Sequence, residues 1–387
     1  MKKIWPFSFY FLYYAAFASL MPFFVIFYQS LGFNGTQIGL LAGIPPLITL
    51  FGAPLGTGLA DLTHRHKLIM GLGLLAAVAV SIFLPNVSGF VVVFGLIILF
   101  NIFMSPIASL SDSATMNMLG DQKAMYGRIR MGGTLGWGIF ALVAGVLVEN
   151  YGLQIAFRLF SVTMFINFLV SQKFYFGNRD EHSSNTGGIK TLLRNRRRVF
   201  FLLNAFLGGV GASTVASYLY PYMAELGAAE TTMGIALTIA TITELPVFFF
   251  GDRLIKKFSS HGLFMIALVL IGVRSLFYAI ASAPFMVLII QAIGGTMFPA
   301  MWLAGVSYVD ANAPAGLKST AQGLFGAMSF GFGSAFGGFA GGLLLGSIGG
   351  RGMFLVVGIV ILAGLALVEG ASRLSPEKEV VKRGCKN

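Results

Sequence analysis

A strongly apolar part of the chain carries charged and aromatic side chains at positions where a membrane would penalise charge: Asp112, Arg128, Arg130 and Trp137. An ionised side chain near the centre of a bilayer costs roughly 2.5–3.5 kcal/mol, so such residues usually serve a pathway or a partner. Asp112 and Arg130 are equally far from Asp121 in the sequence. If the chain folds back there as an antiparallel helix pair, we expect the carboxylate and the guanidinium to face each other at similar depth.

Asp112, Arg130 and Trp137 together have the chemistry of a solute-binding site. Arg130 and Trp137 are seven residues apart and therefore share one face of a helix. The arginine offers a planar fork of donors and the tryptophan an aromatic plate, so together with Asp112 they predict half of a substrate site. The alternative is that Asp112 and Arg128 only flank a turn and that Arg130 is their structural partner.

A second pair of charges predicts the other half of the site. Glu244 and Arg274 each lie fifteen residues from Ser259, which places both roughly 20 Å along their helices and at matching depth. We expect them to be partners, with Glu244 as a proton carrier that Arg274 tunes. Thr243 and Pro246 make this turn polar and irregular, as expected where a helix lines a cavity. The alternative is a static salt bridge between two helices.

Other candidates for substrate contact are uncharged polar or aromatic residues within apolar segments: Tyr13, Tyr14, Phe17, Asn101, Tyr218 and Gln291. Tyr13, Tyr14 and Phe17 form a cluster at helical spacing that can present hydroxyls and a ring to a cavity. Packing against lipid or against neighbouring helices explains the same cluster equally well.

The elements that must position these residues are membrane spans. Of the 387 residues 56% are hydrophobic and 10% are charged, against about 25% charged in soluble domains, which is typical of a polytopic membrane protein. A span needs about 20 apolar residues, and by that rule we expect twelve. They cover residues 7–30, 36–60, 68–85, 90–118, 127–149, 153–175, 199–224, 231–256, 262–281, 284–309, 318–347 and 351–371.

The basic residues indicate the orientation of the chain. Most of the 26 Lys and Arg fall in short connections on one side of the twelve spans, so the positive-inside rule predicts that both termini are cytoplasmic, in an inner (plasma) membrane. Because the net charge of +12 is dispersed over these connections, we expect no nucleic-acid partner. We also expect a monomer that uses no cofactor. We expect no metal site, because the one cysteine, Cys385, lies in the polar tail.

The polar stretches between the apolar spans divide the chain into four segments. We predict a first six-helix bundle at residues 1–175, a cytoplasmic linker at 176–198, a second bundle at 199–371 and a cytoplasmic tail at 372–387. The ends of spans two and eight, near Asp61 and Asp252, resemble each other, which indicates a parallel repeat. The predicted fold is therefore an all-α integral membrane protein of two pseudo-symmetric bundles.

The segment at 126–137, which reads YGRIRMGGTLGW, resembles the helix-five signature of lactose permease and its relatives in the major facilitator superfamily, including nucleoside/proton symporters and phenylpropionate-type permeases. Asp112, Arg130 and Trp137 match the substrate carboxylate, its partner arginine and the tryptophan that stacks on the sugar ring. Glu244 and Arg274 match charged positions on helices eight and nine. The resemblance implies the two-bundle fold of that superfamily.

The sequence also departs from this family. After Asp61 the superfamily motif has a basic residue and then glycine, whereas this chain continues LTHRHK. We therefore expect a differently latched cytoplasmic gate, with Asp61, Arg65, Asp252 and Arg253 as gating residues. On helix ten, lactose permease supplies a histidine and a proton-carrying glutamate, and the run from Gln291 to Pro299 has neither.

These features predict a secondary active transporter that works by alternating access and imports a small polar solute, a sugar or nucleoside, with protons. The missing helix-ten acid keeps an exporter or uniporter open as the alternative. A membrane receptor that transports nothing is the other alternative, and charges in the middle of both halves argue against it. No catalytic motif of the GxSxG or HExxH type is present, so we do not expect an enzyme.

Overall fold

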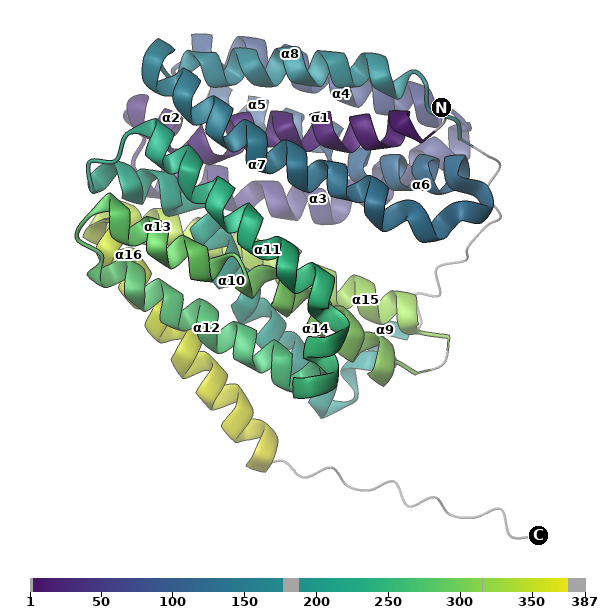
Figure 1. Cartoon of the computed structure of the whole chain (residues 1–387), viewed down its shortest axis with the longest axis vertical. Helices are drawn as coiled ribbons and strands as arrows, with labels where there is room; N and C mark the ends of the chain where they lie inside the picture. The colour runs from purple at the N-terminus through teal and green to yellow at the C-terminus, as the bar shows by residue number, and fades with distance from the viewer. Residues whose placement is uncertain (1–2, 177–187, 315, 375–387) are drawn as a thin grey trace.

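The computed structural model describes residues 3–176, 188–314 and 316–374, and these residues form helices and no strand. The first group of helices comprises α1 (Ile4–Leu20), η1 (Met21–Phe23), α2 (Phe24–Ser30), α3 (Gly35–Thr63), α4 (His66–Phe83), η2 (Leu84–Asn86), α5 (Phe90–Met104), α6 (Ile107–Leu119), η3 (Gly120–Met125), α7 (Tyr126–Tyr151) and α8 (Gln154–Ser171). The second group comprises α9 (Gly188–Leu193), α10 (Arg196–Glu225), α11 (Glu230–Phe258), α12 (Ser260–Ile280), α13 (Pro284–Gly294), α14 (Met297–Asn312), α15 (Lys318–Gly326), η4 (Ala327–Gly333) and α16 (Ser334–Leu374). Figure 1 shows the two groups lying one above the other.

The predicted number of spans is confirmed. Eleven helical runs in the described residues are long and apolar enough to cross a membrane. The last run, Lys318–Leu374, has 57 residues, which is more than twice the roughly 20 residues that one crossing needs. It is divided at Gly349, whose φ of 71° and ψ of 176° lie outside the helical region and suit a residue without a Cβ. The described residues therefore form twelve spans in an all-α fold.

Three spans are interrupted near the middle, and the interruptions position the site. α1 passes through the short helix η1, which contains Pro22, before α2 begins. α5 ends at Met104 and α6 begins at Ile107, directly after Pro106. α13 ends at Gly294 and α14 begins at Met297, two residues before Pro299. Proline lacks the N–H that would continue the helical hydrogen bonds, so carbonyl groups near these breaks are left available to side chains.

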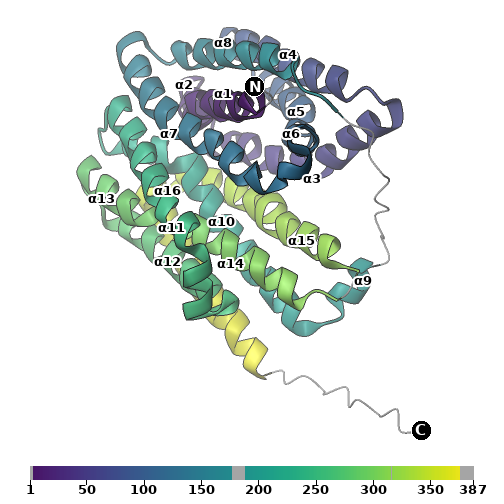
Figure 2. The same cartoon turned by 45° about the vertical axis from the view of Figure 1, so that its right-hand side comes forward.

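The predicted linker and tail lie largely outside the described residues. Of the linker, 176–198, the structure describes 176 and the part from 188 onward, where α9 lies beside α15 (Figure 2) and α10 already begins at Arg196. Of the tail, 372–387, it describes only the last residues of α16, which ends at Leu374. The predicted boundaries of the two bundles remain predictions.

The two groups of helices touch mainly along two crossings, and α10 also contacts η1 and α2. In the first, α3 packs against α16, and a Cβ added at Gly39 would lie 2.6 Å from the Phe339 carbonyl oxygen. In the second, α7 packs against α11, and a Cβ added at Gly145 would lie 2.5 Å from the Glu230 carbonyl oxygen. Such distances are shorter than any carbon–oxygen contact that packing permits, so only glycine allows these backbones to approach so closely.

Both crossings lie toward the same end of the molecule. We call the end that carries the start of α1 and the connection between α8 and α10 the linker face, and the other end the opposite face. The residues in close contact belong to the beginnings of α3 and α11, to the later part of α7 and to the part of α16 before Gly349, all near the opposite face. At the linker face Asp61, Arg128 and Asp252 are exposed. The halves are therefore closed at the opposite face and separated at the linker face.

A single methyl group tests the α3–α16 crossing. We expect Gly39→Ala to destabilise this closed conformation by about 1–3 kcal/mol, because an overpacked contact forces the backbones apart. Gly58→Ala on the same helix is the matched control, since a Cβ there meets nothing within 4 Å. Thermal unfolding in detergent should show a lower Tm for Gly39→Ala only. Equal Tm values for the two variants would contradict the contact.

Candidate functional site

Asp112 lies on α6, two turns after the break at Pro106, and its side chain is half-buried. Its Oδ1 atom accepts a hydrogen bond from the Tyr10 hydroxyl at 2.5 Å and another from the Tyr126 hydroxyl at 3.0 Å. The donors come from α1 and α7, so three spans meet at this carboxylate. Hydrogen bonds to an ionised acceptor are stronger than those between neutral groups, and they offset part of the cost of a charge in the membrane.

Arg130 lies one turn after Tyr126 on α7 and is held by tyrosines of α1. Its Nη2 donates to the Tyr14 hydroxyl, and its Cζ lies 4.3 Å from the centre of the Tyr14 ring and 5.1 Å from the centre of the Tyr10 ring. A guanidinium above an aromatic face gains a favourable cation–π interaction that is stronger when water is excluded.

The expected direct contact between Asp112 and Arg130 is not formed among the described residues. Tyr10 serves both groups instead, because its hydroxyl donates to the carboxylate and the face of its ring receives the guanidinium. The equal distance of the two residues from Asp121 predicted that they lie near each other, and Tyr10 contacts both of them. That spacing gave no information about a ring from α1 that approaches both.

The aromatic cluster of α1 forms as the spacing predicts. Tyr13 packs against Tyr14 and Phe17 with ring centres 5.2 and 4.8 Å apart. Of the three residues, Tyr14 reaches a charged group, whereas Tyr13 is buried and also stacks on Phe9. Trp137 lies two turns beyond Arg130 on α7 and is half-buried.

Glu244 lies on α11, is half-buried and makes no hydrogen bond or ion pair with any described residue. Its helix crosses α7 close to the tryptophan. The Thr238 hydroxyl donates to the Gly138 carbonyl at 2.8 Å, and Gly138 directly follows Trp137 in the chain. Arg130 precedes this contact by eight residues on α7 and Glu244 follows it by six on α11, so both charged residues lie on the linker-face side of the crossing.

Arg274 lies on α12 and has three acceptors, none of them the expected Glu244. Its Nε donates to the Tyr278 hydroxyl at 2.9 Å, its Nη1 to the Gly294 carbonyl at 3.3 Å and its Nη2 to Gln291 Oε1. The Tyr278 hydroxyl donates to the same Gln291 oxygen at 2.9 Å. Gly294 ends α13, where carbonyl groups lack partners within the helix and carry partial negative charge.

The predicted partnership of Glu244 and Arg274 takes the form of an electrostatic interaction between the two side chains, without a hydrogen bond or an ion pair. The guanidinium is satisfied by an amide, a hydroxyl and a helix end, all neutral groups, and the carboxylate is left without a fixed partner. Gln291 was predicted to contact substrate, but its side chain is 1% exposed. It belongs to a hydrogen-bonded group of Arg274, Tyr278, Gln291 and Gly294, which we call the arginine cluster.

The remaining candidates lie away from these two clusters. Tyr218 is fully buried and donates to the Gly338 carbonyl of α16, and Asn101 donates to the Ile97 carbonyl of its own helix at 2.8 Å. Both contacts are structural in this conformation. No group of three or more potential metal ligands occurs in the part of the chain that the structure describes.

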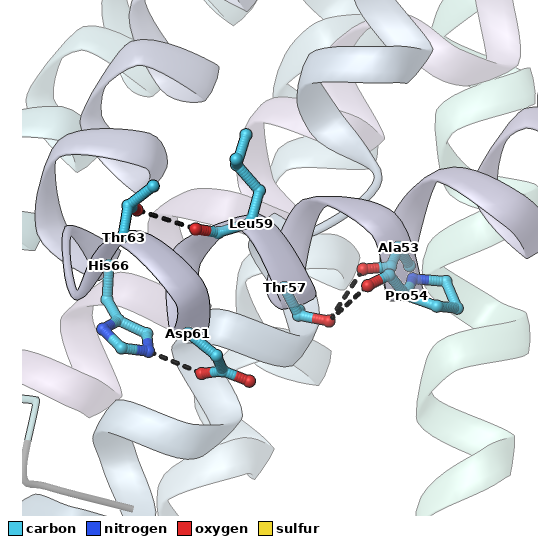
Figure 3. Close-up of polar contacts among 7 residues, drawn as sticks. All are labelled: Ala53, Pro54, Thr57, Leu59, Asp61, Thr63 and His66. Atoms are coloured by element: carbon cyan, nitrogen blue, oxygen red, sulfur yellow. Dashed lines mark hydrogen bonds and ion pairs between the residues drawn. The ribbon is translucent and has the colours of Figure 1, made fainter. Parts of the chain in front are cut away.

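The predicted gating residues lie at the linker face. Asp61 at the end of α3 pairs with His66 at the start of α4, with Oδ1 2.7 Å from Nε2, as Figure 3 shows. Arg65 and Asp252 are exposed, and Arg253 lies over the ring of Phe250 on its own helix at 5.3 Å. The contacts of Asp61 and Arg253 stay within their own halves, as expected when the halves are apart at this face.

The sequence contained a signal for the tyrosines that were not predicted. Tyr126 precedes Arg130 by four residues and Tyr278 follows Arg274 by four, so each tyrosine shares a helical face with an intramembrane arginine. Tyr10 is likewise four residues before Tyr14. An aromatic hydroxyl one turn from an intramembrane arginine is thus the pattern that Tyr126 and Tyr278 share.

The arginine cluster can be tested through its amide. Gln291→Leu keeps the size of the side chain but leaves Arg274 and Tyr278 without their shared acceptor, so we expect a loss of about 1–3 kcal/mol. Asn101→Leu is the control, because that amide contacts only a carbonyl of its own helix. Thermal unfolding in detergent measures both variants, and a Gln291→Leu protein as stable as Asn101→Leu would count against the cluster.

Comparison with known proteins places this geometry in context. The model of the family described as the MFS_1 like family matches residues 4–356. A maltose permease of Geobacillus stearothermophilus is 27% identical over 375 residues, 94% of each chain. A probable 3-phenylpropionic acid transporter of Escherichia coli K12 is 21% identical and covers 78% of this chain and 81% of its own. The solved nucleoside transporter NupG superposes with a TM-score of 0.82 at 17% identity, over 96% of this chain and 99% of its own, which is a likeness of fold.

Proposed function

The chain belongs to the MFS_1 like family, and from this premise we propose that it is a proton-coupled importer of a small polar solute, a sugar or nucleoside. That it is a multi-pass secondary transporter follows from the family and the fold. The proposal adds the coupling ion, the direction and the class of solute.

One observation carries the coupling. Glu244 is an acid within a membrane span that has no hydrogen bond or ion pair with a described residue, although Arg274 is on the neighbouring helix. A carboxyl group without a fixed partner can bind and release a proton without first breaking a salt bridge. The rocking of two halves changes its access to water, so it is protonated from one side and releases the proton on the other.

The first half supplies the binding groups for the solute. Asp112 keeps its Oδ2 atom, and Arg130 uses one N–H group for Tyr14, so both retain capacity for hydroxyls of a ligand. Trp137 offers a ring for stacking. Maltose, phenylpropionate and nucleosides, which the relatives' names specify, each combine a ring with polar groups, and this supports a ring-bearing solute.

The orientation follows from charge. The linker face carries the basic connections, so the positive-inside rule makes it cytoplasmic, with the protein as a monomer in the plasma membrane. In that orientation the conformation described above opens to the cytoplasm. An importer would release its solute from this state.

An exporter or uniporter on the same fold is the second candidate. It is favoured by Gln291, an amide on the span where lactose permease has its proton-carrying acid. A screen of sugars, nucleosides and aromatic acids by thermal shift, followed by uptake with and without a pH gradient, separates the candidates. Accumulation only with an inward proton gradient supports the importer, and uptake that stops at equal concentrations supports the uniporter.

Neutralising the proposed proton carrier should separate coupling from binding. We expect Glu244→Gln in proteoliposomes to lose accumulation driven by a proton gradient and to retain exchange of labelled for unlabelled solute, because an amide cannot release a proton. Glu369→Gln, near the end of α16, is the control and should accumulate normally. Normal accumulation by Glu244→Gln would exclude the carrier role.

The guanidinium of Arg130 should be irreplaceable by an ammonium. We expect Arg130→Lys to lower solute affinity by at least about tenfold, because a lysine cannot reproduce the planar fork or its stacking on Tyr10 and Tyr14. Arg128→Lys is the matched control, since Arg128 is exposed two residues away. Ligand-induced thermal shifts measure both affinities, and equal shifts would remove Arg130 from the binding site.

A further inference from the structure

Glu149, near the end of α7, makes a contact between the two halves at the opposite face. Its Oε2 accepts a hydrogen bond from the backbone N–H of Thr231 at 3.1 Å, and the Thr231 side chain lies against the same carboxylate. Thr231 is the second residue of α11. The carboxylate of one half therefore caps the first turn of a helix in the other half.

The sequence of α11 explains why it needs this cap. The first N–H groups of a helix have no partner within the helix, and a Ser, Thr, Asp or Asn before the first turn usually accepts one of them. In α11 that position is Ala229, which has no side-chain acceptor. Glu149 supplies from α7 the acceptor that α11 lacks, and its negative charge faces the positive end of the helix dipole.

The cap lies at the end of a tightly packed face. Gly138, Gly145 and Glu149 occupy one face of α7, and the two glycines bring the backbones of α7 and α11 close enough for the carboxylate to reach Thr231. If the halves rock apart at the opposite face, Thr231 moves away and its N–H loses this acceptor. The contact is therefore available in one conformation and absent in the other.

We propose that Glu149 is a latch residue that holds the halves closed at the opposite face and so sets the balance between the two conformations of the transport cycle. The inference rests on the alternating access proposed above. A capping interaction of this kind changes an equilibrium by roughly fivefold to tenfold, which is enough to favour one state while leaving the other accessible.

The second half contains a natural control. Glu225, at the end of α10, accepts a hydrogen bond from the Gly350 N–H at 2.8 Å, where the twelfth span begins. This is also a carboxylate that caps a neighbouring span at the opposite face, but both partners belong to the same half. Removing it costs stability without changing how the halves face each other.

The test measures a distance across the opposite face. Spin labels at Val91→Cys and Phe285→Cys, two exposed positions at this face in different halves, are introduced into the full chain with Cys385→Ser, and double electron–electron resonance gives the distance distribution in detergent. We expect Glu149→Ala to raise the population with the longer distance about fivefold to tenfold, and Glu149→Gln, which retains an oxygen acceptor, to raise it less. Glu225→Ala should lower the Tm and leave the distribution unchanged.

An unchanged distribution in Glu149→Ala would overturn the proposal, as would an equal shift in Glu225→Ala. If Glu149→Ala does not fold, the same comparison is made with Glu149→Gln. The distances require no solute and no proton gradient, so failure of the latch leaves the proposed transport activity untouched. Conversely, a failed uptake assay leaves the latch intact.

Discussion

The cost of charge in a membrane is the constraint on which this structure depends. Arg130 and Arg274 lie within spans, and both are satisfied by neutral groups, namely tyrosine hydroxyls and rings, an amide and a helix end. Such partners stabilise a guanidinium without adding a second charge that must also be desolvated. Because no described ion pair joins these arginines to Asp112 or Glu244, the two acids are free of a fixed cation. A transporter needs that freedom if its acids are to bind a solute or a proton.

The breaks in the spans make this arrangement possible. In a continuous helix each carbonyl group already accepts a backbone hydrogen bond, whereas a carbonyl at a break has its full accepting capacity for an arginine. α13 ends at Gly294 and presents a carbonyl to Arg274, and the break at Pro106 begins the helix that carries Asp112. Irregular backbone at membrane depth is tolerated where protein surrounds it. The same breaks that weaken the spans therefore build the site.

Closure at the opposite face depends on small residues and on few polar contacts. Glycines in α3 and α7 allow the backbones of the two halves to approach closely, and hydrogen bonds from Thr231 and Thr238 add direction. An interface of this kind is held by packing more than by charge, so it can separate without exposing buried ions. This property suits halves that rock about a central site.

The sequence by itself determined the membrane class, the twelve spans, the family resemblance and the positions of Asp112, Arg130, Glu244 and Arg274 along their spans, because hydropathy and the fixed rise of a helix specify how far along a span each residue lies. Only the tertiary structure decided the partners. Tyr10 between Asp112 and Arg130, and Gln291 beside Arg274, come from other spans, and the rotation of each helix and the choice of its neighbours arise from packing over the whole molecule. Equal depth is necessary for two charges to pair, but a third side chain at the same depth can take the place of either one.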